Sequence, residues 1–222
     1  MTSMMHTKKS TRFLDLTMTA LTLGLAATIT AQAELEFHIG VFSDYIDNGE
    51  SKSDNNAVVQ GGLEYGHASG VFAGVAMSTL GSGEGQEVVP FVGYSFGLGE
   101  LDFEVGYEYF HYSEGDDRYE GEVFAAVEHE PFYAEVSYIV RAHDRDAEGD
   151  TVYLVGARHD FLPDTFFDVA FGYDRPRKDD NATFWSLGVG RNLGTGEISL
   201  TYASRDESDA QDLFVAGYTL SF

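Results

Sequence analysis

Cysteine is absent from the sequence, and cations are scarce, with 13 lysines and arginines against 37 aspartates and glutamates. Without cysteine the chain can form neither disulfides nor thiolate metal sites. The formal net charge of −24 argues against nucleic acid as a partner, because binding to phosphates depends on lysine and arginine. The acidity suits divalent cations or a cation-bridged sugar surface; alternatively, it only keeps an exported protein soluble.

The first 33 residues have the pattern of a secretory leader. A basic start with Lys8 and Lys9 precedes an apolar stretch, and Ala31-Gln32-Ala33 supplies a cleavage site of small residues. A membrane anchor is the alternative, but this stretch is short and diluted by threonine. We therefore expect 1–33 to be a cleaved signal peptide and 34–222 to be the mature domain. No later apolar run reaches the ~18 residues of a transmembrane helix.

Apolar and polar residues alternate with a period of two along almost all of residues 34–222, which is typical of β-strands. Turn residues divide this alternation into about 12 segments. The predicted strands are 35–45, 57–67, 70–80, 86–96, 100–112, 118–129, 131–142, 150–160, 164–174, 181–193, 195–205 and 211–222. No linker or helical periodicity interrupts them, so the sequence predicts one all-β domain.

The connections between these strands alternate between short turns and longer, charged loops. The short turns are 67–69, 97–99, 130–131, 161–163 and 193–195. The longer loops are 46–56, 81–85, 113–117, 143–149, 175–180 and 206–210. A soluble β-sandwich has no reason for this order, whereas a membrane barrel has short turns at one rim and long loops at the other. The sequence therefore predicts a transmembrane antiparallel up-and-down β-barrel of about 12 strands.

Each predicted strand has a mainly apolar side and a mainly polar side. Phe103 and Val105, for example, alternate with Asp102 and Glu104. In a membrane the apolar side should face lipid and the polar side the lumen. Aromatic residues near strand ends are expected to form interfacial girdles. These residues are Phe37, Tyr45, Tyr94, Phe96, Tyr109, Tyr119, Phe132, Tyr173, Phe184 and Tyr202.

The last predicted strand resembles the closing strand of bacterial outer-membrane barrels. Its segment GYTLSF, 217–222, alternates apolar residues and ends on Phe222. The resemblance implies that Phe222 is an assembly signal, recognised by the barrel-assembly machinery after delivery by periplasmic chaperones. It also implies a location in the outer membrane of a Gram-negative bacterium, in contact with lipid and lipopolysaccharide.

The stretch Ser43–Leu80 is similar to the N-terminal signature of the TorF-type porin family of proteobacteria. Its matching motifs are SDY at 43–45, GESKS at 49–53, QGGLEY at 60–65 and SGVFAG at 69–74. Asn48 and Ala57 depart from the family pattern, which commonly has arginine and proline there. The resemblance implies an outer-membrane barrel with a transport role.

Carboxylates dominate the polar side of the predicted strands, and rings of carboxylates in a pore favour cations. The acidic pore-lining candidates are Glu64, Asp102, Glu104, Glu108, Glu120, Glu122, Glu128, Glu135, Asp168 and Glu197, and the basic ones are Arg141, Arg158 and Arg205. Alternatively, glutamates and arginines pair with one another and plug a narrow barrel. No long constriction loop is evident from the sequence.

Catalytic and metal-binding motifs are incomplete in this sequence. His38, His111 and His159 are the candidates for a barrel enzyme, but no G-x-S-x-G or H-E-x-x-H signature accompanies them. The run from Asp144 to Asp150 begins like a calcium loop, yet Val155 stands where the twelfth-position glutamate is needed. We therefore expect no enzyme, no cofactor and no metal site.

These features together predict a monomeric outer-membrane channel for passive diffusion of small cationic or neutral solutes. A non-conducting structural or adhesive barrel is the alternative, and a barrel enzyme has less support. Conductance separates the first two hypotheses.

Overall fold

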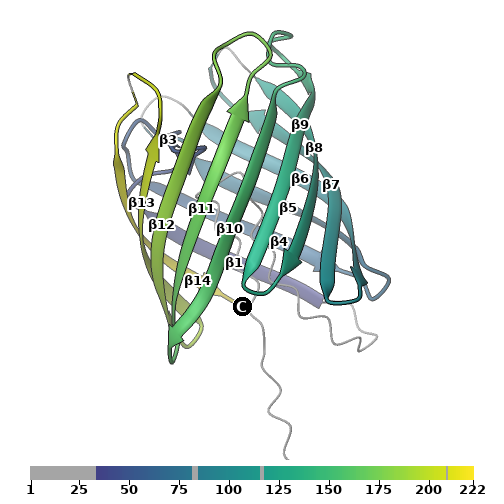
Figure 1. The fold of residues 1–222 in the computed structure, drawn as a ribbon, viewed down its shortest axis with the longest axis vertical. Helices are drawn as coiled ribbons and strands as arrows, with labels where there is room; N and C mark the ends of the chain where they lie inside the picture. Colours follow the sequence, from purple (N-terminus) through teal and green to yellow (C-terminus); the bar gives the residue numbers. More distant parts are fainter. Residues whose placement is uncertain (1–33, 82–84, 116–117, 209) are drawn as a thin grey trace, which may run out of the picture.

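The computed structural model describes residues 34–81, 85–115, 118–208 and 210–222; the predicted leader lies outside this part of the chain. Twelve antiparallel strands form a closed barrel, which confirms the predicted fold (Figure 1). They are β1 (Glu34–Phe42), β4 (Val58–Gly66), β5 (Val71–Thr79), β6 (Gln86–Leu98), β7 (Leu101–Tyr112), β8 (Tyr119–His129), β9 (Phe132–Ala142), β10 (Thr151–Leu162), β11 (Thr165–Arg175), β12 (Ala182–Leu193), β13 (Gly196–Arg205) and β14 (Leu213–Ser221). Two short strands, β2 (Ile46–Asp47) and β3 (Glu50–Ser51), form a separate hairpin.

The barrel closes through β1, which pairs with β4 on one side and with β14 on the other. The remaining barrel strands pair with their neighbours in the sequence. Short turns lie at the end of the barrel where β1 begins and β14 ends, and the longer loops lie at the opposite end (Figure 1). Because the ladder is closed, no strand edge is left for lipid to meet, as a membrane barrel requires.

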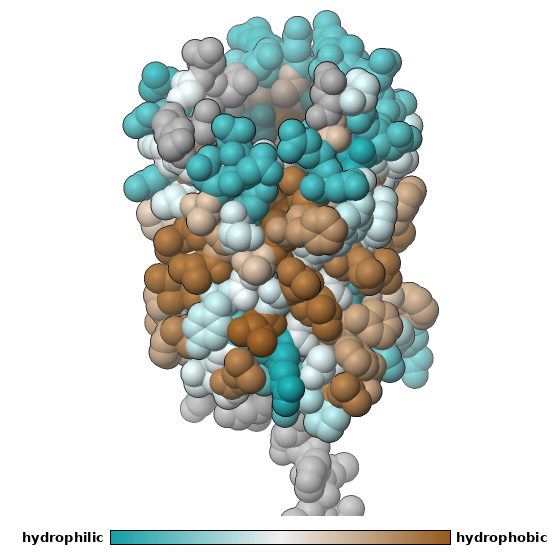
Figure 2. Space-filling view, turned by 90° about the vertical axis from the view of Figure 1, so that its left-hand side faces the viewer, coloured by the Kyte–Doolittle hydropathy of each residue, from teal (hydrophilic) through white to brown (hydrophobic). Residues whose placement is uncertain are grey.

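The outer surface is apolar along every barrel strand. On β1, for example, Leu35, Phe37, Ile39 and Val41 are 64%, 43%, 41% and 53% exposed. Figure 2 shows such residues as a belt on the side of the barrel, below hydrophilic loops. A water-soluble monomer rarely exposes so large an apolar surface, whereas lipid accommodates it. The predicted outward side of the strands is thus confirmed. No helix among the described residues is long and apolar enough to cross a membrane.

The inward side is less uniformly polar than the alternation predicts. Phe72, Phe91 and Phe124 form a buried cluster inside the barrel. Phe184 is also buried, at 1% exposure, so its predicted place in an outer girdle is wrong. Its ring packs against the backbone of Gly172 on β11, where an added Cβ would lie 2.0 Å from Phe184 Cζ. Glycines in the wall therefore make room for aromatic rings that fill part of the interior.

Candidate functional site in the barrel interior

All but one of the pore-lining candidates lie at inward-facing positions of their strands. The buried ones are Glu64, Glu104, Glu108, Glu122 and Glu197. The half-buried ones are Asp102, Glu120, Glu128, Glu135, Arg158, Asp168 and Arg205. These side chains therefore lie on the interior side of the wall.

Arg141 is the exception, because the structure places it on the outer surface. A β-bulge interrupts the pairing of β8 with β9, so that Glu122 faces Ile139 while Gly121 faces Arg141. The extra residue reverses the side on which the next side chain emerges. Arg141 is exposed, and its guanidinium lies 5.3 Å from the ring centroid of Tyr119.

Strands β7, β8 and β9 bring acidic residues together across the sheet. Glu108 lies directly opposite Glu122, and Asp102 lies directly opposite Glu128. Like charges in such facing positions destabilise a sheet unless cations or protons compensate them. This part of the interior therefore concentrates carboxyl groups that need cations or protons as partners.

The opposite wall combines acids with one arginine. Arg158 Nη2 lies 3.7 Å from Glu197 Oε2, and its guanidinium lies 3.4 Å from the ring centroid of Phe166. Tyr133 donates a hydrogen bond to Asp168 at 3.2 Å. Part of the predicted ion pairing is thus present on this wall.

The first long connection, residues 43–57, is here called the inner loop, because it turns into the barrel. Ile46 is fully buried and Tyr45 is 5% exposed, whereas the sequence predicted a charged external loop and a girdle position for Tyr45. Both predictions are wrong. The two side chains pack with inward residues near the loop end of the wall, namely Phe42, Val58, Leu80, Ala203, Leu213 and Val215. Burial of a large apolar side chain is worth ~1.5–3 kcal/mol, which favours this inward position over exposure to water.

Asp44 organises the inner loop internally. Its Oδ1 accepts hydrogen bonds from the hydroxyls of Ser51 and Ser53, both at 2.6 Å, and from the backbone N–H of Tyr45 at 2.7 Å. The turn between β2 and β3 contains Asn48 and Gly49 with positive φ values of 49° and 83°. The loop is therefore a compact unit with its own hydrogen-bond network.

Lys52 attaches one side of the inner loop to the wall. Its Nζ lies 2.7 Å from Glu87 Oε2 and 3.3 Å from Asp47 Oδ2. The same Nζ lies 5.4 Å from the ring centroid of Tyr45 and 5.3 Å from those of Phe110 and Tyr112.

Glu87, on β6, is 1% exposed and also accepts a hydrogen bond from the Tyr45 hydroxyl at 2.9 Å. Burial by itself would lower the pKa of Lys52, but the neighbouring carboxylates of Glu87 and Asp47 raise it by more than burial lowers it. The pKa of Lys52 therefore lies above its ordinary value, and the ammonium group stays charged.

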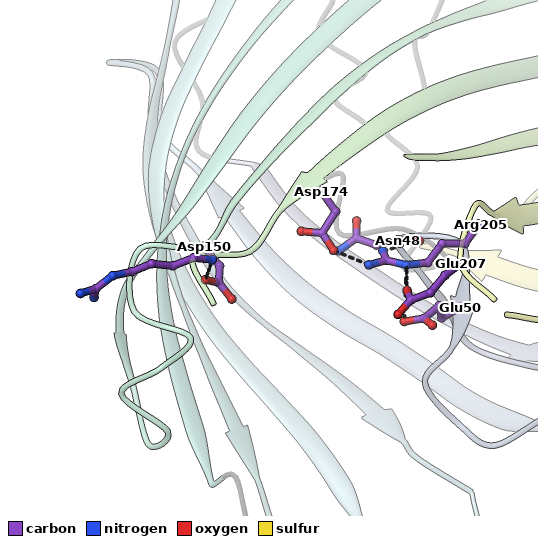
Figure 3. Close-up of polar contacts among 7 residues, drawn as sticks. Asn48, Glu50, Asp150, Asp174, Arg205 and Glu207 are labelled. Atoms are coloured by element: carbon purple, nitrogen blue, oxygen red, sulfur yellow. Dashed lines mark hydrogen bonds and ion pairs between the residues drawn. The ribbon is translucent and has the colours of Figure 1, made fainter. Parts of the chain in front are cut away.

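Arg205, at the end of β13, holds the other side of the inner loop (Figure 3). Its guanidinium donates to Asp174 at 2.7 Å, to Glu207 at 2.8 Å and to the backbone oxygen of Asn48 at 3.2 Å. Glu50 of β3 lies 3.9 Å away. Burial raises the pKa of Glu50, and the charge of Arg205 partly offsets this rise. One arginine thus connects the inner loop to the end of β11 and to the loop that follows β13.

Sequence reasoning missed Lys52 and Glu87. Glu87 shares the inward side of β6 with the apolar residues Val89 and Phe91. Polar and apolar residues therefore do not separate onto two sides of this strand, and the alternation does not mark Glu87 as inward. Lys52 stands in a segment of mostly charged residues that is typical of an external loop. Tyr45 and Ile46 are apolar residues near the start of the inner loop. They are the signal that could have indicated the inward position of this loop.

The residues considered for catalysis do not form a cluster. His38 is buried on β1, while His111 and His159 are exposed on β7 and β10. Within the described ranges, no group of three or more histidines, aspartates and glutamates is placed to hold a metal ion.

Comparison with known proteins gives a family and a fold. The family model described as "Bacterial protein of unknown function (Gcw_chp)" matches residues 26–218. No curated protein matches the sequence. Among solved structures, the KdgM porin superposes with a TM-score of 0.57 at 9% identity, over 86% of this chain and 99% of that chain.

Two further solved structures are equally similar. The KdgM porin in complex with disordered oligogalacturonate gives a TM-score of 0.58 at 8% identity, over 86% of this chain and 99% of that chain. A structure from "Unveiling the Mechanism Behind the in-meso Crystallization of Membrane Proteins" gives a TM-score of 0.58 at 8% identity, over 85% of this chain and 83% of that chain. At such low identity the likeness concerns the fold.

Proposed function

The chain belongs to the Gcw_chp family of bacterial proteins, and we propose that it is an outer-membrane channel for passive diffusion of small cationic or neutral solutes. The observation that carries the proposal is the acidic interior of a closed barrel whose outer surface is apolar. Carboxylates that face a confined lumen raise the local concentration of cations and repel anions. The proposed function needs no chemical step.

The porin neighbour with a bound ligand provides a contrast in charge. Its ligand, oligogalacturonate, is by its name a polymer of sugar acids and therefore an anion. The facing pair Glu108 and Glu122 in the present interior would repel such a polymer. The acidic interior of the present barrel would therefore favour cationic or neutral solutes over such an anion.

The proposed location follows from the same features. The apolar belt suits outer-membrane lipid, and the hydrophilic loops would contact lipopolysaccharide. Residues 1–33 would direct export and be removed, and Phe222 would be the signal for the assembly machinery. The likeness of Ser43–Leu80 to the TorF-type signature supports the same transport role.

A non-conducting structural barrel is the second candidate, and the inner loop favours it. Lys52 and Arg205 attach this loop to opposite parts of the wall, and its apolar residues fill space at the loop end of the barrel. A channel would therefore have its narrowest part beside the inner loop, whereas a structural barrel would be closed there.

Single-channel recording separates the two candidates. The barrel, refolded and inserted into a planar bilayer, should conduct, and its reversal potential in a salt gradient should show cation preference. Preference for anions would contradict the proposed selectivity. Absence of conductance in barrels that are folded and inserted would favour the structural role.

A further inference from the structure

The environment of Lys52 divides into groups from the wall and groups from the inner loop. Tyr45 and Asp47 belong to the loop, as Lys52 itself does. Glu87 on β6 and Tyr112 on β7 belong to the wall, where they are direct cross-strand partners. Phe110, two residues earlier on β7, places its ring 5.3 Å from Lys52 Nζ. We call Glu87, Phe110 and Tyr112 the wall cation site.

The wall cation site has the chemistry that recognises an ammonium group. Aromatic faces attract a cation through the ring quadrupole, and most strongly where water is excluded. A carboxylate as buried as Glu87, at 1% exposure, needs a cationic partner, because an unpaired buried charge is strongly unfavourable. The wall supplies the carboxylate and two of the rings, whereas the cation comes from a loop.

We propose that the wall cation site binds the primary ammonium group of cationic solutes, and that Lys52 is a tethered occupant which such a solute displaces. The ligand class is therefore primary amines. The part of this proposal that concerns transport rests on the proposed channel function, whereas binding of an amine to the site does not.

The tether has a quantitative consequence. A group held near its site by a short chain segment competes at an effective concentration of the order of millimolar or above. The apparent affinity of wild-type protein for a free amine is therefore the intrinsic affinity of the site multiplied by the fraction of sites that Lys52 leaves vacant. Removal of the Lys52 side chain should strengthen amine binding by about tenfold or more.

The test uses n-butylammonium, which has the four carbons and the ammonium group of a whole lysine side chain; Lys52→Ala vacates all of that side chain beyond Cβ. Binding to the folded barrel in detergent is measured by calorimetry. Lys52→Ala should bind n-butylammonium about tenfold or more tightly than wild type. Adding Glu87→Gln to that variant should abolish the gain. The matched control is Lys178→Ala, which removes a lysine that is 54% exposed and paired with Asp146 at 3.6 Å, and it should behave as wild type.

Neutral n-butanol, similar in shape, distinguishes charge recognition from simple filling of the vacated space. The proposal is overturned if n-butanol binds Lys52→Ala as well as the amine does, or if Lys52→Ala binds the amine no better than wild type. Should Lys52→Ala fail to fold, refolding is repeated with each compound. Restored folding with n-butylammonium but not with n-butanol supports the site, and absence of rescue refutes it.

These measurements do not depend on conductance. Amine binding by a barrel that does not conduct would keep the wall cation site and reject the channel. A conducting, cation-selective barrel whose Lys52→Ala variant ignores amines would keep the channel and reject the site.

Discussion

Phe222 and Phe37 exchange two backbone hydrogen bonds, which extend the pairing of β14 with β1 to the last residue of the sequence. The N–H of Phe222 donates to the oxygen of Phe37 at 2.8 Å, and the N–H of Phe37 donates back at 3.2 Å. Their rings lie 5.9 Å apart between centroids, and Phe222 is 70% exposed. The residue proposed as an assembly signal is thus also part of the seam that closes the barrel.

Deletion of Phe222 should reduce assembly, because it removes a backbone pair of the closing seam together with an outward aromatic ring. The expected result is a smaller fraction of protein that migrates as the folded form on gels without heating, and lower levels in the outer membrane. Phe214→Ala is the matched control, because Phe214 is also 70% exposed but lies within β14. Equal assembly of the deletion and the control would contradict the role of Phe222.

Lysine on the outer side of a strand should destabilise the barrel. Val105 is 44% exposed and lies on the apolar belt, and a lysine facing mid-bilayer lipid costs ~2–4 kcal/mol. Val105→Lys should therefore lower the free energy of unfolding by about this amount in denaturant titrations in lipid vesicles. Thr201→Lys places the same charge inside, where Thr201 and Asp168 pair with Gly188 from its two sides, and should be tolerated. A similar loss in both variants would mean that the outer surface does not face lipid.

Removal of interior charge should weaken cation preference without loss of folding. Glu104, Glu108 and Glu122 are buried on the inward side, and changing all three to glutamine keeps side-chain size and relieves repulsion between facing glutamates. The reversal potential should move towards the value of a channel that does not discriminate between cations and anions. The shift should be clearest at low salt, because the screening of charges by salt is weakest there.

The control for this triple variant changes the net charge of the protein by the same amount outside the lumen. Glutamine at Glu100, Glu114 and Glu130, which are exposed residues of turns and loops, fulfils this condition. Its reversal potential should remain close to that of wild type. Equal shifts in the two triple variants would show that total charge, and not interior charge, determines selectivity.

A methyl group at Gly172 should destabilise the barrel from inside. The added Cβ would lie 2.0 Å from Phe184 Cζ, and overpacking of this kind costs ~1–3 kcal/mol. Gly188→Ala on β12 is the control, since its nearest neighbour would be Thr201 Oγ1 at an ordinary 3.5 Å. In a double-mutant cycle, Phe184→Ala should abolish most of the effect of Gly172→Ala. An effect that persists without the Phe184 ring would refute this packing.

The strands and the two sides of the wall follow from the order of residues alone. A period of two places alternate side chains on opposite faces of any strand, so the positions of Val105 and Glu104 follow from local order alone. The alternation of short turns and long loops likewise indicates the antiparallel barrel without reference to any contact. These features depend on neighbours in the chain and on the contrast between lipid and lumen.

The exceptions to this alternation depend on how the strands are arranged in three dimensions. Arg141 faces outward because a bulge forms between two particular strands, and a bulge depends on how the partner strand pairs. Phe184 packs inside because Gly172 on the adjacent strand leaves room for its ring. Lys52 meets Glu87 because the closed barrel offers the inner loop an apolar surface made by strands that are distant in the sequence. Such contacts depend on the curvature and register of the whole barrel, which local alternation does not encode.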